Sequence, residues 1–202
     1  MKAVKKDPGY GLAYAGLADS YVLLGWNSHL APKEAFPTGK VAAMTALRLD
    51  ANLAEAHTSL AAILWLYDWR WEEAEAEFKR SLDLSPNYAT GNHWYAEYVM
   101  TMGRQAEAIT RMKNGQDLDP LSLIINVAVG WAFYHARRYD EAIEQLRRTV
   151  ELDPNYPVTY WSSPKFWLLQ AEIAAGSAGK STRRNRSWKR RSSRNASMLG
   201  SI

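Results

Sequence analysis

A short run near the end of the chain has the residue types of a phosphate-binding loop. Residues 174–181 read AAGSAGKS, which matches the relaxed pattern of such loops with alanine in place of the first glycine. In that motif backbone N–H groups cradle phosphates between a strand and a helix, Lys180 would reach the outer phosphates, and Ser181 would bind magnesium. Here the preceding residues predict a helix, and no strand is predicted anywhere. We therefore interpret the match as chance and predict no nucleotide-hydrolysing activity.

Histidine and acidic side chains offer a second place for chemistry. The chain has four histidines, and Glu97 follows His93 by one helical turn, which places both side chains on one helix face. Such a pair can bind a metal or transfer a proton. However, the HExxH spacing of a zinc site is absent, and no Ser/His/Asp arrangement is legible. We predict a non-catalytic protein without metal or cofactor, in which His93 and Glu97 are polar residues lining a surface.

The end of the chain is strongly basic. Residues 176–202 carry eight Lys or Arg, no Asp or Glu, and few apolar residues. Such a segment cannot bury enough surface to offset its ordering entropy, so we predict a disordered tail. With Trp188 among its charges, the tail would suit a nucleic acid or an anionic membrane surface, which is the alternative function. The abrupt change of composition near residue 161 also permits a shifted reading frame, a hypothesis that translating the other two frames would test.

Composition limits the other function classes. Residues 1–175 contain 17 basic and 21 acidic side chains, so this part of the chain is mildly acidic. The absence of cysteine excludes disulfides and cysteine-ligated metals. No run of about 18 apolar residues predicts a membrane span, and residues 1–10 lack the apolar core of a secretion signal. We expect a cytoplasmic protein.

The elements that would position these residues are helix hairpins, most clearly over residues 123–156. Apolar residues recur there at helical spacing in two runs, which the polar joint 137–140 separates and Pro154 ends. The small residues Gly130 and Ala142 stand where the two helices would cross. One such hairpin cannot bury both of its apolar faces, so similar neighbours are expected.

Four units in phase resemble the tetratricopeptide repeats. The units are residues 11–53, 54–88, 89–122 and 123–156. Repeat position 8 is small in that family and here reads Ala18, Ala61, Ala96 and Gly130. Position 20 is also small and reads Ala74, Ala108 and Ala142, and position 32 reads Pro86, Pro120 and Pro154. The resemblance implies an all-α fold, a right-handed α-solenoid of stacked helix-turn-helix hairpins within an array over residues 11–161.

The first unit departs from this pattern. Residues 1–10 look like the end of a truncated repeat. The stretch WNSHLAP at residues 26–32 then makes the first full unit too long, and it is either an ordered loop that covers the inner surface or a lengthened turn. Pro37 is expected to delay the start of the second helix, which we place at about residues 33–49.

The repeat pattern stops after Trp161. Ser163 and Pro164 stand where a fifth repeat would need Leu and Gly or Ala, but they can open a fresh helix. We therefore predict an extra helix over residues 162–175, which Gly176 would end.

The resemblance also implies a binding surface. In the family, the first helix of each hairpin lines an inner groove that binds an extended or helical peptide. Positions 2, 5, 9, 12 and 13 line it, and the matching residues here give a groove of Asp19, Val22, Leu23, Thr58, Trp65, Leu66, His93, Glu97, Met100, Thr101, Val127, Trp131, Tyr134 and His135. Relatives that clamp the terminal carboxylate of a peptide have Lys, Arg and Asn at these positions. This sequence has none of the three there, so that ligand is disfavoured.

This groove would be aromatic and mildly acidic, with the large side chains that dominate binding at interfaces. An alternative stays open, in which Trp65 and Trp131 pack against neighbouring repeats. The repeats are also similar to arrays attached to bacterial winged-helix regulators, kinases and adenylate cyclases. The resemblance thus implies a scaffold that binds a protein or peptide partner, as a fragment of a bacterial signalling or regulatory protein. No small-molecule substrate is expected, and nucleic acid is expected only through the tail.

Overall fold

The computed structural model describes residue 4, residues 6–153 and residues 166–177 of the 202-residue chain. The chain divides into two compact units, Met1–Ile125 and Asn126–Ile202. The predicted start of the extra helix and residues 178–202 of the predicted tail lie outside the described residues.

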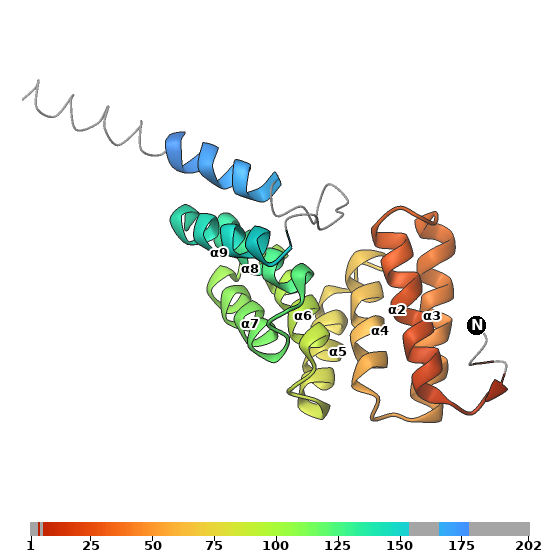
Figure 1. Cartoon of the computed structure of the whole chain (residues 1–202). Helices are drawn as coiled ribbons and strands as arrows, with labels where there is room; N and C mark the ends of the chain where they lie inside the picture. Colours follow the sequence, from red (N-terminus) through yellow and green to blue (C-terminus); the bar gives the residue numbers. More distant parts are fainter. Residues whose placement is uncertain (1–3, 5, 154–165, 178–202) are drawn as a thin grey trace, which may run out of the picture. The chain divides into compact units, whose positions relative to one another are not determined.

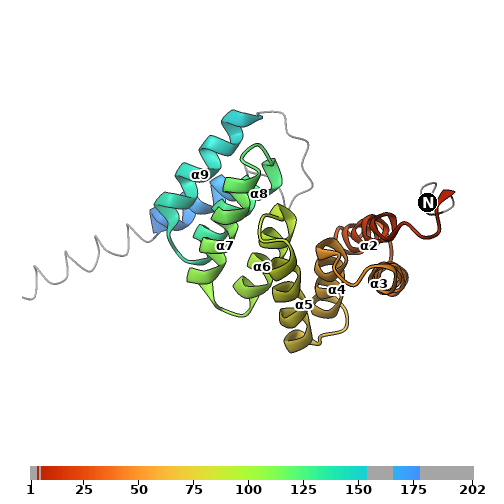
Figure 2. The same cartoon turned by 90° about the horizontal axis from the view of Figure 1, so that it is seen from below.

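Helix hairpins build the first unit. Its helices are α2 (Gly11–Trp26), α3 (Pro32–Leu49), α4 (Ala54–Leu66), α5 (Trp71–Leu84), α6 (Ala89–Thr101) and α7 (Gln105–Leu118). Helices α2 and α3, α4 and α5, and α6 and α7 pair, and α4 contacts both α2 and α6. Figures 1 and 2 show α2, α3 and α4 side by side. No strand occurs in the part of the chain that the structure describes, so the predicted all-α class of stacked hairpins is confirmed.

Small side chains allow the helices of the first unit to approach one another. Ala18, Ala61 and Ala96, at repeat position 8, are fully buried. At Gly39 on α3 even the β-carbon of an alanine would be crowded, because it would lie 3.1 Å from the β-carbon of Tyr21. Small residues at these places let helix backbones pack closely without voids. The repeat spacing of small residues is therefore a packing requirement.

Each turn inside a hairpin contains one residue in the left-handed region. These residues are Ser28 (φ 58°), Trp69 (φ 59°), Gly103 (φ 78°) and Arg137 (φ 60°). Glycine adopts this conformation without a steric penalty, whereas a side chain with a β-carbon adopts it at a cost of about 1–2 kcal/mol. Trp69 is the bulkiest residue of the four, so its turn has the least suitable side chain for its backbone.

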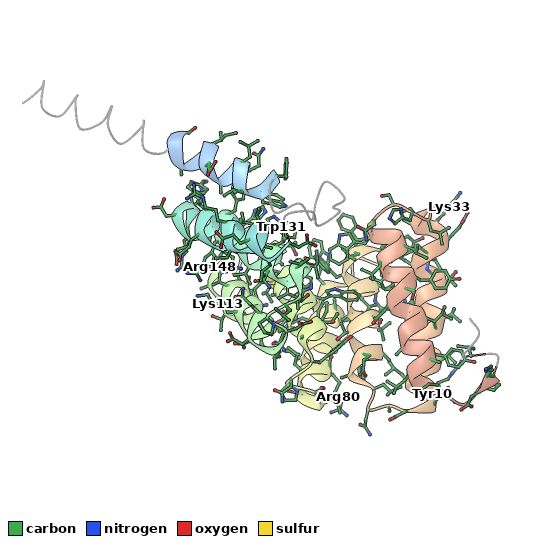
Figure 3. All side chains as sticks on the ribbon, viewed as in Figure 1. Tyr10, Lys33, Arg80, Lys113, Trp131 and Arg148 are labelled. Atoms are coloured by element: carbon green, nitrogen blue, oxygen red, sulfur yellow. The ribbon has the colours of Figure 1, made fainter. Side chains whose placement is uncertain are left out.

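The prediction that Pro37 delays the start of α3 is wrong. The helix begins at Pro32, and Pro37 lies inside it. Proline removes the hydrogen bond to the carbonyl four residues earlier, here that of Lys33. Lys33 is exposed in the first turn of α3 (labelled in Figure 3), so water can satisfy that carbonyl. A single proline near an exposed helix start is therefore tolerated.

An aromatic stack joins the second and third hairpins. Phe78 on α5 is fully buried, and its ring centroid lies 5.5 Å from that of Tyr95 and 5.6 Å from that of Tyr98, both on α6. Aromatic pairs at this separation contribute beyond the area that they bury. This stack forms the apolar centre of the joint between the two hairpins.

Charged residues surround the same joint, and we call Glu75, Lys79, Arg104 and Glu107 the charged tie. Glu75 on α5 lies 2.8 Å from Lys79 Nζ and 2.9 Å from Arg104 Nη1. The Arg104 guanidinium also lies 2.6 Å from Glu107. Hydrogen bonds from Lys79 and Arg104 lower the pKa of Glu75 to about 2. The charged tie thus connects consecutive hairpins at their surface.

The second unit contains most of α8 (Leu123–His135), α9 (Tyr139–Leu152) and a helical segment at residues 166–177. A β-carbon on Gly130 would lie only 2.5 Å from Cγ of Leu146. Leu146 of α9 packs with Val127 of α8 and with Trp167. The prediction that a small residue is needed where these helices cross is confirmed at Gly130.

Two expectations about the end of the chain need correction. Gly176 does not end the extra helix, because residues 166–177 are helical throughout. Glycine inside a helix costs about 1 kcal/mol relative to alanine, which is too little to stop a helix that other contacts hold. Residues 176 and 177, which we predicted to be disordered, therefore belong to this helix. None of the described helices has both the length and the apolar character needed to cross a membrane.

Candidate functional site

Aromatic rings connect the first helices of the three hairpins in the first unit, and we call Trp26, Trp65, Trp94 and Tyr98 the aromatic ladder. The ring centroids of Trp26 and Trp65 lie 5.5 Å apart at an interplanar angle of 87°. Trp26 also lies 6.2 Å from Trp94, and Trp65 lies 6.0 Å from Tyr98. Trp94 and Tyr98 are buried, whereas Trp26 and Trp65 are half-buried. The ladder therefore places α2, α4 and α6 along one face with two tryptophans partly open to solvent.

The structure divides the groove residues predicted in the first unit into two groups. An accessible group is exposed or half-buried and contains Asp19, Leu23, Trp65, Leu66 and Thr101. A second group is buried and contains Val22, Thr58, His93, Glu97 and Met100. Thr58 is part of the core, where its hydroxyl lies 2.7 Å from the hydroxyl of the buried Ser81 on α5. A partner could contact the first group without any rearrangement of the hairpins.

Three residues of the aromatic ladder were missed by sequence reasoning. Trp94 and Tyr98 stand at repeat positions 6 and 10, outside the positions that the family resemblance selects. Trp26 lies in the inserted stretch, where it is the last residue of α2, and its ring reaches both α4 and α6. The insertion therefore supplies a side chain to this face and also lengthens the turn.

Asp19 is a partly buried acid on the same face. Its carboxylate accepts a hydrogen bond from the hydroxyl of Ser59 on α4. Burial raises the pKa of Asp19 to about 6, the Ser59 hydrogen bond opposes this rise, and the nearby Glu55 carboxylate adds to it. Burial likewise raises the pKa of the neighbouring Tyr88, and the negative charge of Asp19 adds to this rise. A carboxylate held in this way titrates close to neutral pH.

Asp19→Asn is expected to stabilise the protein at neutral pH. The folded state binds the Asp19 proton more tightly than the unfolded state, so the contribution of Asp19 to stability falls as pH rises from about 4 to about 6. The asparagine avoids this loss and still accepts the Ser59 hydrogen bond. The free energy of unfolding should exceed that of the wild type by about 2–3 kcal/mol at pH 7 and by nearly nothing at pH 4. Urea denaturation at several pH values measures the difference.

The control for this prediction is Asp117→Asn, which changes an exposed acid on α7. Its stability should follow the pH dependence of the wild type. A difference between Asp19→Asn and the wild type that does not change between pH 4 and pH 7 would contradict the assignment of that titration to Asp19.

His93 and Glu97 do come together on α6. His93 Nε2 lies 3.2 Å from Glu97 Oε1, and both side chains are buried. The geometry does not make a hydrogen bond, so Nε2 is left without one. Among the described residues no group of three His, Cys, Asp or Glu side chains could hold a metal. His93 and Glu97 are thus buried side chains of α6, and the prediction that they line an exposed surface is wrong.

The groove residues predicted in the second unit contact the chain's own residues 166–177. Trp131 of α8 (labelled in Figure 3) lies 5.6 Å from Trp167 between ring centroids, and Tyr134 lies 5.4 Å from it. His135 lies 6.1 Å from the same ring, and Val127 belongs to the same apolar cluster. Burial lowers the pKa of His135. In this unit Trp131 packs against the helical segment 166–177, which is not one of the neighbouring repeats that the alternative interpretation named.

The run that resembles a phosphate-binding loop starts in a helix. Residues 174–177 are the end of the segment 166–177, and residues 178–181 lie outside the described residues. A strand would have to precede a working loop. The basic residues of the tail also lie outside the described residues, so binding of nucleic acid or an anionic surface stays a prediction.

No protein-family model matches the sequence, and no curated protein matches it. Solved structures of many other proteins do match the fold. TTC0263, a thermophilic TPR protein of Thermus thermophilus, has a TM-score of 0.66 and 17% sequence identity, with 86% of each chain covered. YrrB, described as a TPR protein with an unusual peptide-binding site, has a TM-score of 0.53 and 17% identity over 86% of this chain and 89% of that one.

A further match is a complex with a peptide. The first TPR of Spaghetti (RPAP3), bound to the HSP90 peptide SRMEEVD, has a TM-score of 0.54 and 16% identity. The match covers 63% of this chain and 96% of that one. At these identities the likeness concerns the arrangement of the helices.

Proposed function

We propose that this chain, which has the tetratricopeptide-repeat fold, is a non-catalytic module that binds a segment of a partner protein on the face formed by α2, α4 and α6. The aromatic ladder carries the proposal. Its half-buried tryptophans, Trp26 and Trp65, lie on α2 and α4, and the exposed side chains of Leu23 and Thr101 lie on α2 and α6. Aromatic rings that a rigid scaffold already holds lose little conformational entropy on binding, so they suit an interaction surface.

The matched structures support this proposal. YrrB is described as having a peptide-binding site, and the RPAP3 domain is bound to a peptide. The absence of a legible catalytic arrangement in the sequence agrees with a scaffold. We also propose that the chain is part of a bacterial signalling or regulatory protein. The support for this is that its repeats are similar to arrays attached to bacterial winged-helix regulators, kinases and adenylate cyclases.

Leu23→Asp is expected to remove partner binding without loss of the fold. Leu23 is 47% exposed on α2, so a charge at this site should cost the folded protein little. Burial of a leucine in an interface contributes about 1.5–3 kcal/mol, so affinity should fall by about tenfold or more. Affinity capture with the tagged full chain, followed by quantitative mass spectrometry, compares the proteins retained by the variant and by the wild type.

Met44→Asp is the matched control, because Met44 is 51% exposed but lies on α3, the second helix of its hairpin. It should retain the same proteins as the wild type, and circular dichroism should report equal helix content for all three proteins. If Leu23→Asp retains the same proteins in the same amounts as the wild type and the control, the proposed surface is wrong.

A further inference from the structure

Two tryptophans stand out from the surface at the turn between α4 and α5. Trp69 is 71% exposed and Trp71 is 46% exposed, and their ring centroids lie 6.1 Å apart at an interplanar angle of 37°. Among the described Phe, Tyr and Trp residues, only Tyr10 is comparably exposed. Large aromatic side chains left in solvent on a soluble protein are typical of interaction sites.

The backbone gives a second reason to assign a role to Trp69. Its φ of 59° lies in the left-handed region, where the next hairpin has Gly103. A bulky side chain destabilises the folded state in this conformation. Because the ring is also mostly exposed, it does not recover that cost by packing in the core. Glycine at position 69 would therefore give a more stable turn, and the requirements of folding do not account for the presence of a tryptophan there.

The charged residues beside the rings are two acids and one arginine, which together carry a net negative charge. A shallow hollow of about 320 Å³ is lined by Trp69, Arg70, Trp71, Glu72 and Glu73. Arg70 forms an ion pair with Glu73, with 2.5 Å between Arg70 Nη2 and Glu73 Oε1. Glu72 forms no ion pair with any described residue. A carboxylate that lines the same hollow as two indole rings favours a cation, because both the carboxylate and the negative face of an aromatic ring attract it. The same carboxylate repels phosphate, which argues against nucleic acid and anionic lipid.

We propose that Trp69, Trp71 and Glu72 form a second docking site, which binds a lysine- or arginine-bearing segment of a partner protein. The cationic side chain lies against the indole faces and its charge is neutralised by Glu72. The site belongs to the α4–α5 turn and does not use the face of α2, α4 and α6, so the two proposals succeed or fail independently.

The test measures binding of a capped hexa-arginine peptide to the full chain by isothermal titration calorimetry at about 0.15 M salt. A capped hexa-citrulline peptide has nearly the same shape without the charge, and it should bind at least about tenfold more weakly. Glu72→Gln and Trp71→Ala should each weaken hexa-arginine binding by about threefold or more, in keeping with exposed cation–π and charge pairs.

Trp69→Gly separates docking from folding. It should weaken hexa-arginine binding by about threefold or more and raise the midpoint of thermal unfolding by about 2–4 °C, because it removes the left-handed tryptophan. Asp117→Asn and Leu121→Ala are the matched controls, since both change exposed residues away from this turn and keep the same tail. They should bind hexa-arginine as the wild type does.

Three results would overturn the proposal. One is hexa-arginine binding that does not differ among the wild type, the three site variants and the two controls. Another is equal affinity for hexa-citrulline and hexa-arginine, because the charge would then not matter. The third is preferential binding of anionic phospholipid vesicles that is lost in Trp69→Gly, which would assign the rings to a membrane surface.

Discussion

Replacing Phe78 with alanine should lower the free energy of unfolding of the first unit by about 3–5 kcal/mol. The side chain is fully buried on α5, and its ring packs on Tyr95 and Tyr98 of α6. Its truncation removes apolar contacts between consecutive hairpins and leaves a cavity that the helices cannot fill completely. Urea denaturation followed by far-ultraviolet circular dichroism measures the loss.

Two further variants keep this prediction testable if the alanine variant does not fold. Phe78→Leu retains most of the apolar volume and should cost about 1–2 kcal/mol. Leu121→Ala changes a side chain that is 76% exposed, so its effect should stay within about 0.5 kcal/mol. Equal stability of Phe78→Ala and Leu121→Ala would contradict a packed joint between the second and third hairpins.

The second large effect is expected at Trp167. Trp167→Ala should destabilise the second unit by about 3–5 kcal/mol, because this buried ring contacts Trp131 and Tyr134 of α8. Hydrogen exchange should then accelerate at the backbone amides of residues 166–177 and at the end of α8. Mass spectrometry of deuterium uptake measures both regions in one experiment.

Leu169→Ala is the control for Trp167→Ala, because Leu169 lies on the same helical segment and is 54% exposed. It should leave deuterium uptake close to that of the wild type. If Trp167→Ala also leaves uptake unchanged, the segment does not hold the rings of α8, and Trp131 and Tyr134 become available to a partner as the family resemblance implies.

The positions of the helices could be read from the sequence because the packing rule is local. Each hairpin needs a small residue where its helices approach the next ones, and Ala18, Ala61 and Ala96 recur in phase for that reason. Pro37 was misjudged because a sequence pattern does not report that the carbonyl freed by proline is at an exposed helix start. Gly176 was misjudged because the strength of a helix stop depends on the contacts of the residues before it.

The candidate site was less predictable than the fold. Helical spacing identifies the side of a helix on which His93 and Glu97 lie, but it does not reveal that this side is buried. Trp26 was missed because it belongs to an insertion, for which the repeat pattern offers no register. Trp69 was missed because its role depends on a backbone angle and on exposure, neither of which a sequence records.

The joint between the second and third hairpins combines two interactions that respond differently to the medium. The charged tie lies at the surface, where dissolved ions weaken Coulomb attraction, whereas the stack of Phe78 on Tyr95 and Tyr98 is apolar. Added electrolyte should therefore loosen the rim of this joint and leave its centre in place. The bending stiffness of the three-hairpin unit is therefore expected to fall as ionic strength rises. A segment docked on the proposed face of α2, α4 and α6 would then meet a more deformable surface at high salt than at low salt.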